Sequence, residues 1–178
     1  YENGLTPNPC GVCNRQIKFG IFFGKAMEMG FDYIATGHYA QIRLEDGIHR
    51  LVRAVDVQKD QSYFLYAIRY DALARTLFPL GGYTKPQVRE IAQQNALPVH
   101  SKRDSQDICF IDRNGYGAFL HSYTGLSAPP GNFVDVHGNI LGTHQGIWHY
   151  TVGQRKGLGI SLGEPAYVLA VRPQDNTV

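Results

Sequence analysis

The stretch Phe31-Asp32-Tyr33-Ile34-Ala35-Thr36-Gly37-His38 gives the clearest indication of the fold class. Its first six positions are mostly apolar, as in a short buried strand, and Gly37 and His38 follow the end of that strand. Before it, the residues from Asn14 to Gly30 repeat apolar side chains at helical spacing. A helix followed by such a strand predicts half of an α/β repeat, in which ligands bind at the carboxyl ends of the strands. We therefore expect Gly37 and His38 to contact a ligand.

The rest of the chain continues with helical and strand-like patterns. Two further strands are expected at 39–44 and 49–55, flanking a turn signal at Asp46-Gly47. The later expected elements are helices at 62–68, 71–77 and 85–95, a strand at 107–111, a helix at 116–123, and strands at 133–136 and 140–142.

Length and composition describe a packed, soluble protein. The 178 residues are 43% hydrophobic and 18% charged, which excludes a disordered chain, a collagen-like fibre and a coiled coil. Lys and Arg number 17 against 15 Asp and Glu, so the net charge is only +2 and any nucleic-acid site must be local. No apolar run approaches the ~18 residues that span a membrane. Three cysteines indicate a reducing compartment, which we take to be the cytosol.

Two of the cysteines have CxxC spacing in Pro9-Cys10-Gly11-Val12-Cys13. We expect this segment to be a loop leading into a helix N-terminus, where unpaired backbone N–H groups favour a thiolate and hence a nucleophile or redox thiol. The same spacing fits half of a zinc site, completed by Cys109 and one histidine. Cys109 lies between Ile108 and Phe110, and packing in a core explains it equally well.

Three other segments gather polar or cationic residues. Lys59-Asp60-Gln61-Ser62-Tyr63-Phe64 combines donors, an acceptor and aromatic rings, which suits contact with a phosphate and a base edge but also a capped helix with a solvated first turn. Lys102-Arg103 precedes Cys109. Gly153-Gln154-Arg155-Lys156-Gly157-Leu158-Gly159 joins two cations with flexible backbone, a pattern compatible with a phosphate contact.

Taken together, these segments resemble the tRNA-specific 2-thiouridylases, which place sulfur on the wobble uridine of certain tRNAs. The motifs occur in the family's order over nearly the whole chain: Thr6-Pro7-Asn8-Pro9, Cys13-Asn14, Ile17-Lys18-Phe19, Asp32-Tyr33-Ile34-Ala35-Thr36-Gly37-His38-Tyr39, Lys59-Asp60-Gln61-Ser62-Tyr63-Phe64-Leu65, Phe78-Pro79-Leu80-Gly81, Lys85-Pro86, Asp104-Ser105, Ile108-Cys109-Phe110-Ile111 and Gly153-Gln154-Arg155-Lys156-Gly157-Leu158-Gly159.

The resemblance implies an α/β fold in three parts. The first is a parallel-sheet domain of the adenine-nucleotide α-hydrolase-like type, also called a PP-loop ATPase, followed by a small central domain and a C-terminal β-barrel. We expect residues 1–115 to be the C-terminal part of the catalytic domain, without the half that carries the phosphate loop. Residues 116–164 are then the central domain, and 165–178 the first strand of the barrel.

The activity implied is ATP-dependent 2-thiolation of the wobble uridine by a tRNA-uridine 2-sulfurtransferase. ATP, with Mg²⁺, adenylates the C2 oxygen of the uracil, and a cysteine persulfide delivers sulfur to C2 as AMP departs. Cys109 matches the cysteine that carries the persulfide, and Cys13 matches the nucleophile that closes a Cys13–Cys109 disulfide. The implied partners are tRNA and a sulfur-donor protein, and we expect a monomeric cytoplasmic protein with no membrane contact and no tightly bound metal.

The resemblance also assigns binding residues. Asn8, Pro9 and Cys10 match the loop at the target base, and Gly37 matches an ATP contact. His38 matches a tRNA contact, and Lys59-Asp60-Gln61 matches a tRNA-contacting segment. Since C2 is inaccessible in a stacked anticodon loop, the uridine must leave its stack.

Two departures from the family's pattern limit this transfer. Several members have aspartate where this chain has Cys10, so the role of Cys10 stays open. The Ser-Gly-Gly-x-Asp-Ser phosphate loop does not occur in the 178 residues, and we expect the chain alone to be inactive.

Two other functions are compatible with parts of the sequence. One is a zinc-stabilised RNA-binding module that uses Cys10, Cys13 and Cys109 without catalysis. The other is an adenylating enzyme of the same superfamily that uses ammonia in place of sulfur, which leaves the paired cysteines unexplained.

Overall fold

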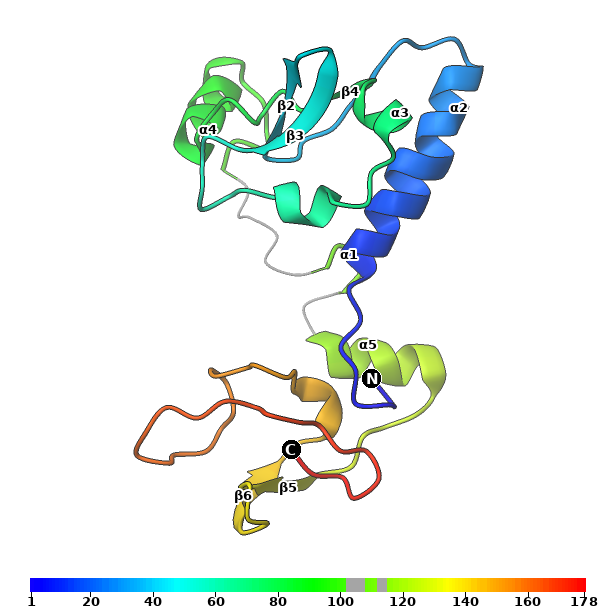
Figure 1. Cartoon of the computed structure of the whole chain (residues 1–178). Coiled ribbons are helices and arrows are strands. Elements are labelled where there is room, and N and C mark those ends of the chain that lie inside the picture. Colours follow the sequence, from blue (N-terminus) through cyan, green and yellow to red (C-terminus); the bar gives the residue numbers. More distant parts are fainter. Residues whose placement is uncertain (102–107, 112–114) are drawn as a thin grey trace. The chain divides into compact units, whose positions relative to one another are not determined.

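The computed structural model describes residues 1–101, 108–111 and 115–178. The chain divides into two compact units, which we describe separately (Figure 1). The α/β unit comprises Asn8–Ser105, and the C-terminal unit comprises Tyr1–Pro7 together with Gln106–Val178. Within the described residues, no helix is both long enough and apolar enough to cross a membrane.

A continuous helix opens the α/β unit. It consists of α1 (Pro9–Val12), the π-helical segment η1 (Cys13–Phe22) and α2 (Phe23–Glu28). The Asn8 side-chain oxygen accepts a hydrogen bond from the Gly11 backbone N–H at 3.2 Å, and the fixed φ of Pro9 suits a first helical turn. The predicted helix start at Asn14 is wrong, because Asn8 caps the helix. The helix ends as predicted before Gly30, which has a φ of 83°.

Two pairs of strands follow. β1 (Ile34–Ala35) pairs in parallel with β4 (Thr76–Leu77), and β2 (Ala40–Glu45) pairs antiparallel with β3 (Ile48–Arg53). The parallel pair confirms the predicted parallel sheet, although β1 is shorter than the 31–36 stretch predicted. Asp46 and Gly47 both have positive φ, 51° and 76°, which confirms the hairpin turn between β2 and β3.

The remaining elements of this unit are short. They are the 3₁₀ helix η2 (Ser62–Leu65), α3 (Tyr70–Leu73) and α4 (Lys85–Gln94). The predicted helix at 71–77 is wrong in its second half, because the buried Thr76 pairs with Ile34 in the parallel ladder. The predicted helix at 85–95 is confirmed, and it opens with a capping box between Thr84 and Gln87.

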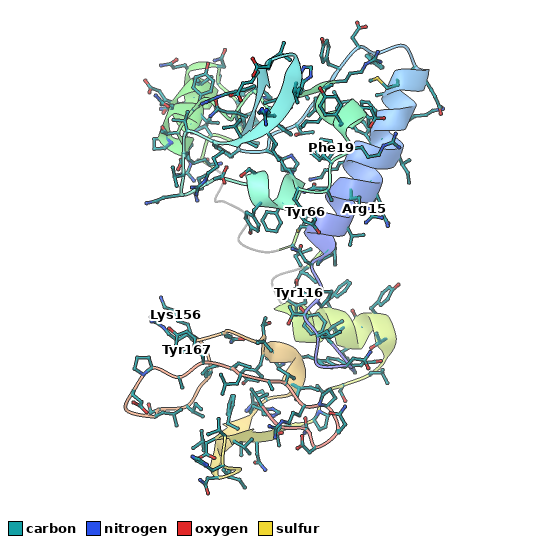
Figure 2. The ribbon with its side chains drawn as sticks, viewed as in Figure 1. Arg15, Phe19, Tyr66, Tyr116, Lys156 and Tyr167 are labelled. Atoms are coloured by element: carbon teal, nitrogen blue, oxygen red, sulfur yellow. The ribbon has the colours of Figure 1, made fainter. Side chains whose placement is uncertain are left out.

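The helix and the strands enclose one apolar core. The side chain of Phe19, labelled in Figure 2, is 2% exposed and its ring lies 6.2 Å from that of Phe78, just after β4. The buried residues of this core are Phe19, Phe23, Ala26, Ile34, Ala40, Leu65, Ala72 and Phe78. Because Ile34 of β1, Phe78 after β4 and the helix all contribute to it, the core fixes the helix against the parallel strands.

The C-terminal unit contains one helix and a small antiparallel sheet. Its elements are α5 (Gly115–Thr124), β5 (Gly131–Val134), β6 (Ile140–His144) and the 3₁₀ helix η3 (Ile147–His149). The last residues lie along β5, where the Val178 N–H donates to the Asn132 carbonyl at 3.0 Å. Buried Phe133, Tyr150 and Val168 form its core. The helix predicted at 116–123 and the two strands predicted after it are confirmed within two or three residues.

Candidate functional site

The CxxC segment lies inside the first helical turns. Cys10 belongs to α1 and Cys13 opens η1, so the predicted loop position of these thiols is wrong. Both side chains are partly exposed. Asn8 remains outside the helix as its cap, so the three residues predicted to meet the target base occupy one cap and the first helical turn.

The helix around Cys13 is held by the η2 segment. The buried Asn14 side chain donates from Nδ2 to the Phe64 carbonyl at 3.2 Å. Burial, with the nearby Cys10 thiol as a second cause, raises the pKa of the Tyr63 hydroxyl. Tyr63 is therefore a neighbour of Cys10 that the CxxC spacing does not predict. The only sequence signal for it was the aromatic pair Tyr63-Phe64 in the polar segment that follows Lys59.

Gly37 and His38 lie just beyond the carboxyl end of β1, as predicted. Gly37 is exposed, and a Cβ added there would meet only the Leu80 side chain, at an ordinary contact distance of 3.7 Å. The His38 side chain is half-buried, and its Nδ1 lies 2.8 Å from Thr36 Oγ1. Its Nε2 lies 3.4 Å from Lys18 Nζ on the helix, so both ring nitrogens have partners within the chain.

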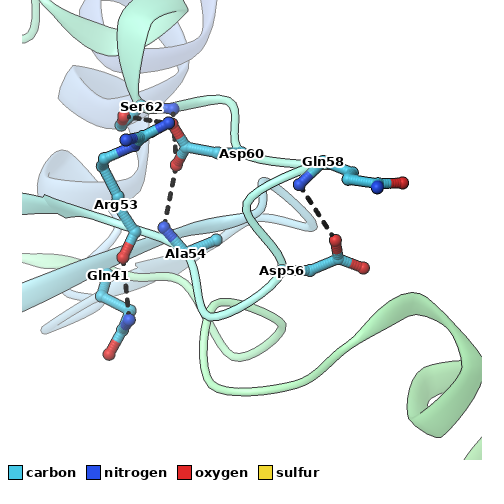
Figure 3. Close-up of polar contacts among 7 residues, drawn as sticks. All are labelled: Gln41, Arg53, Ala54, Asp56, Gln58, Asp60 and Ser62. Atoms are coloured by element: carbon cyan, nitrogen blue, oxygen red, sulfur yellow. Dashed lines mark hydrogen bonds and ion pairs between the residues drawn. The ribbon is translucent and has the colours of Figure 1, made fainter.

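Asp60 is the centre of a polar network after β3 (Figure 3). Its carboxylate accepts hydrogen bonds from the Ala54 N–H and the Ser62 hydroxyl, both at 2.8 Å, and Arg53 Nε lies 3.5 Å away. Burial alone would raise the pKa of the Asp60 carboxyl, but these hydrogen bonds and the Arg53 charge outweigh it and hold the pKa below its usual range. The side chain is only 8% exposed.

The neighbours of Asp60 in the predicted tRNA-contacting segment differ in their surroundings. The Gln61 side-chain oxygen accepts from the Tyr39 backbone N–H at 3.0 Å, which ties the segment to the residue after His38. Lys59 is half-buried. The Asp60 carboxylate and the Gln61 side-chain oxygen are thus engaged within the chain, where they fix the conformation of the loop that carries Lys59.

Cys109 belongs to the C-terminal unit and is exposed. The strand predicted at 107–111 is wrong over its described residues, because Ile108–Ile111 form a turn closed by a hydrogen bond from the Ile111 N–H to the Ile108 carbonyl at 2.9 Å. Phe110 packs against Phe119 of α5, with ring centroids 5.3 Å apart. The predicted cations Lys102-Arg103 lie outside the described residues.

The glycine-rich segment after η3 is a solvated loop. Its cations Arg155 and Lys156 are both exposed (Lys156 is labelled in Figure 2). Gln154 supports the loop, because its side chain accepts from the Thr151 N–H and donates to the Lys156 carbonyl. The loop therefore presents two positive charges to solvent, as a phosphate contact requires.

All three cysteines lie among the described residues, and all are free thiols. Within the described part of the chain, no three His, Cys, Asp or Glu side chains come close enough to hold one metal ion. Because Cys13 and Cys109 belong to different units, the predicted pairing of these two residues stays a prediction.

Two family models together match nearly the whole chain. The model described as the tRNA methyl transferase HUP domain matches residues 1–113, and that described as the tRNA methyl transferase PRC-barrel domain matches residues 117–178. These matches confirm the predicted α/β fold of the HUP type and place a barrel-type domain after it. The predicted central domain at 116–164 and first barrel strand at 165–178 stay predictions.

Curated relatives carry a more specific name. The chain is 54% identical over 179 residues to the tRNA-specific 2-thiouridylase MnmA of Lachnoclostridium phytofermentans, with all of the chain and 50% of that protein covered. It is 53% identical over 180 residues to the protein of the same name from Acetivibrio thermocellus and 52% identical over 180 residues to that of Carboxydothermus hydrogenoformans. All of the chain is covered again, with 50% and 49% of these relatives, so it spans about half the length of the proteins it matches.

The predicted resemblance is confirmed by these matches. The chain belongs to the tRNA methyl transferase HUP and PRC-barrel family, whose relatives matched here are named tRNA-specific 2-thiouridylases.

Proposed function

We propose that the protein containing this chain is a tRNA-uridine 2-sulfurtransferase that thiolates the wobble uridine of tRNA at the expense of ATP. The observation that carries the proposal is the presence of two free thiols, Cys13 and Cys109, within a segment that is about half identical to proteins named tRNA-specific 2-thiouridylases. A sulfur transfer of this kind needs two thiols, which the ammonia-dependent alternative leaves without a role.

The two cysteines divide the sulfur chemistry between them. The uracil C2 oxygen attacks the α-phosphorus of ATP and pyrophosphate leaves, which makes the oxygen part of a good leaving group. The terminal sulfur of a Cys109 persulfide then attacks C2, and AMP departs with the oxygen. The Cys13 thiolate attacks the Cys109 sulfur, breaks the bond between that sulfur and the transferred one, and forms a Cys13–Cys109 disulfide. The Cys13 sulfur is thereby oxidised and the transferred sulfur is reduced, while the oxidation state of the Cys109 sulfur does not change. A thiol reductant then restores both cysteines.

The carboxyl edge of the parallel strands fits the nucleotide. Gly37 lies there with its backbone exposed, and neither its φ nor its packing within the described residues demands a glycine. A close approach of ligand to backbone gives the missing reason for glycine, which supports Gly37 as an ATP contact. Mg²⁺ would accompany the triphosphate and neutralise part of its charge. The Ser-Gly-Gly-x-Asp-Ser loop does not occur in these 178 residues, so we expect the isolated chain not to turn over ATP.

The tRNA is proposed to reach the same edge. Asn8, Pro9 and Cys10 form the cap and first turn of the helix that carries Cys13, which suits them to receive a base turned out of its stack. We infer that Lys59 and His38 lie near the tRNA. Asp60 and Gln61 support that contact through the network that shapes their loop.

The wider setting follows from the chemistry. A persulfide at Cys109 has to be supplied by a sulfur-donor protein, and the exposure of this thiol in a turn suits such delivery. Free thiols, ATP and tRNA occur together in the cytosol, where we place a monomeric enzyme without a tightly bound metal.

We propose domains at 1–115 (catalytic), 116–164 (central) and 165–178 (first barrel strand).

The test uses the full-length protein that contains this chain. Wild type, Cys13→Ser and Cys109→Ser are incubated with ATP, a persulfide donor and unmodified tRNA, and 2-thiouridine is measured in the digested tRNA. We expect both variants to lose at least ~1,000-fold in rate, because each removes a nucleophile that the other residues cannot replace. Full activity in either variant, or stoichiometric zinc bound by the cysteines, contradicts the proposal.

A further inference from the structure

Three polar side chains form a line of contacts at the carboxyl edge of β1. Lys18 reaches His38 from the helix, with 3.4 Å between Nζ and Nε2, and His38 reaches Thr36, with 2.8 Å between Nδ1 and Oγ1. The rings of Phe19 and Phe78 each lie 6.0 Å from the imidazole, which restricts its orientation. Lys18 is therefore held at the same edge as Gly37.

The imidazole in this line is neutral. Burial, reinforced by the Lys18 charge, lowers the pKa of His38 to about 4. An ammonium group can only donate hydrogen bonds, so Nε2 accepts from Lys18 and the ring proton is on Nδ1, which donates to the Thr36 hydroxyl. His38 thus fixes the Lys18 ammonium without neutralising it.

Lys18 has no carboxylate partner within the described residues. Other cations there do have carboxylate partners, among them Lys25 with Glu28, Arg50 with Glu45, Arg53 with Asp60 and Arg69 with Asp71. Lys18 contacts a neutral ring instead, although it is only partly exposed. A partly buried ammonium without a carboxylate, held at an edge where ligands bind, has the electrostatics of an anion site.

We propose that Lys18 binds a phosphate group at this edge and that His38 is the residue that positions its ammonium. The inference rests on the proposed function, which brings two phosphate-bearing molecules to the protein, a nucleoside triphosphate and tRNA. The chemistry is the same for both, since a phosphate oxygen accepts a charge-assisted hydrogen bond from Lys18 Nζ. His38 uses one of the three ammonium donors, and two remain for phosphate oxygens.

The first test compares Lys18 variants of the full-length protein by equilibrium binding. Lys18→Met removes the charge and keeps most of the length of the side chain, whereas Lys18→Arg keeps the charge. Lys25→Met is the matched control, because Lys25 lies on the same helix but is exposed and pairs with Glu28 at 3.1 Å. The dissociation constant of ATP is measured by calorimetry and that of tRNA by filter binding at several salt concentrations.

We expect Lys18→Met to raise the dissociation constant of one of the two ligands about tenfold or more, because the variant loses one charge-assisted hydrogen bond. If tRNA binding weakens and the slope of its affinity against salt concentration falls by about one phosphate contact, the ligand of Lys18 is the tRNA backbone. If ATP binding weakens, the ligand is the nucleotide. Lys18→Arg and Lys25→Met should both stay within about threefold of wild type. Thermal melting of each variant separates lost binding from lost folding, and Lys18→Gln replaces the methionine variant where the latter melts early.

The outcomes separate this proposal from the proposed function. Unchanged binding of both ligands to a folded Lys18→Met or Lys18→Gln protein overturns the role of Lys18 alone. A wild-type protein that binds neither ligand overturns both proposals. Since binding is measured at equilibrium, the result does not depend on whether 2-thiouridine forms.

The role of His38 is tested in the same assay. His38→Gln places an amide oxygen near the position of Nε2 and should retain most of the binding, whereas His38→Ala should weaken it nearly as much as Lys18→Met. Because His38 acts through Lys18, the double variant Lys18→Met/His38→Ala should be no weaker than Lys18→Met. A further full loss in the double variant overturns the positioning role.

Discussion

Cys13 and Cys109 are held in opposite ways by the two units of the chain. Cys13 opens the η1 segment of a helix whose Phe19 is 2% exposed and whose Asn14 is bonded to the Phe64 carbonyl. Cys109 is an exposed residue of a four-residue turn, beside a phenylalanine that packs on α5. In the sulfur transfer that we propose, this difference suits Cys13 to act as the positioned attacking thiol and Cys109 to act as the accessible thiol that receives sulfur.

The largest expected effect is on the packing that fixes the Cys13 helix. Gly81 lies so close to Ala40 that an added Cβ would overlap the Ala40 carbonyl oxygen, and its own carbonyl accepts from the Val55 N–H at 3.0 Å. Gly81→Ala therefore forces two backbone segments apart beside the core residue Ala40. We expect the free energy of unfolding, measured in urea, to fall by about 3 kcal/mol.

The neighbouring glycine is the matched control for this change. A Cβ at Gly82 meets nothing within 4 Å, so Gly82→Ala should alter the unfolding free energy by less than about 0.5 kcal/mol. Alkylation of Cys13 should accelerate in Gly81→Ala while alkylation of Cys109 does not. Equal acceleration of both thiols would show that the two cysteines do not depend on separate packing.

A smaller effect is expected from the Asp60 network. Asp60→Asn keeps the size of the side chain but removes the negative charge of the carboxylate that accepts hydrogen bonds from Ala54 and Ser62 and pairs with Arg53. We expect the free energy of unfolding to fall by about 2 kcal/mol. The folded pKa of Asp60 is depressed below its ordinary value of 3.8. Its contribution is thus present above about pH 4 and is lost as the pH falls through the folded pKa.

The control for Asp60 is a carboxylate in an exposed ion pair of the same unit. Asp71 pairs with Arg69 at 2.7 Å, and 54% of the Asp71 side chain is exposed. Asp71→Asn should change the unfolding free energy by less than about 0.5 kcal/mol. Similar losses in both variants would mean that the buried network adds nothing beyond surface charge.

The two thiols should also differ in their rate of alkylation. In the denatured chain the cysteines should react with iodoacetamide at similar rates. In the folded chain we expect Cys109 to react about tenfold faster than Cys13, because the helix restricts access to the Cys13 thiol. Mass spectrometry of digested samples quantifies each site, and equal rates in the folded chain would remove the contrast between the two environments.

The sequence could predict what depends on neighbouring residues. The β2–β3 hairpin follows from Asp46-Gly47, and α4 follows from Thr84, Pro86 and Gln87, because each signal acts within a few residues of its effect. The strand that precedes Gly37 is predictable for the same reason. The helix start was missed because Asn8 and Asn14 are both suitable caps, and only packing decides between them.

The contacts of the site depend on distant residues and could not be predicted locally. His38 follows its strand as expected, but its partner Lys18 lies 20 positions earlier and its neighbour Phe78 follows β4. The local sequence places Thr76 near the end of a helix, and only its pairing with the distant Ile34 shows that it belongs to a strand. The turn at Cys109 is similar, since Ile108, Phe110 and Ile111 have the composition of a strand but pair with no strand among the described residues.

The smallest effect is a difference in acid sensitivity between the units. His144 is 1% exposed, accepts from the Gly146 N–H at 3.1 Å and faces the Asn176 carbonyl at 3.2 Å. Burial lowers its pKa below 6.5, so protonation favours the unfolded state. The stability that neutral His144 provides is complete above about pH 6.5 and is lost as the pH falls through the folded pKa, at no more than about 1.4 kcal/mol per pH unit.

The single tryptophan, Trp148, is buried in the same unit as His144, so its fluorescence during urea unfolding reports on that unit. We expect the loss caused by His144 to begin below about pH 6.5 and to level off below the folded pKa of that residue, and the loss caused by His38 in the α/β unit to continue to about pH 4. His144→Gln should remove the pH dependence of the Trp148 signal, and His38→Gln should leave it unchanged. A Trp148 signal that responds equally to both variants would show that the two units unfold as one, and the contrast between their cysteines would then have to come from local exposure alone.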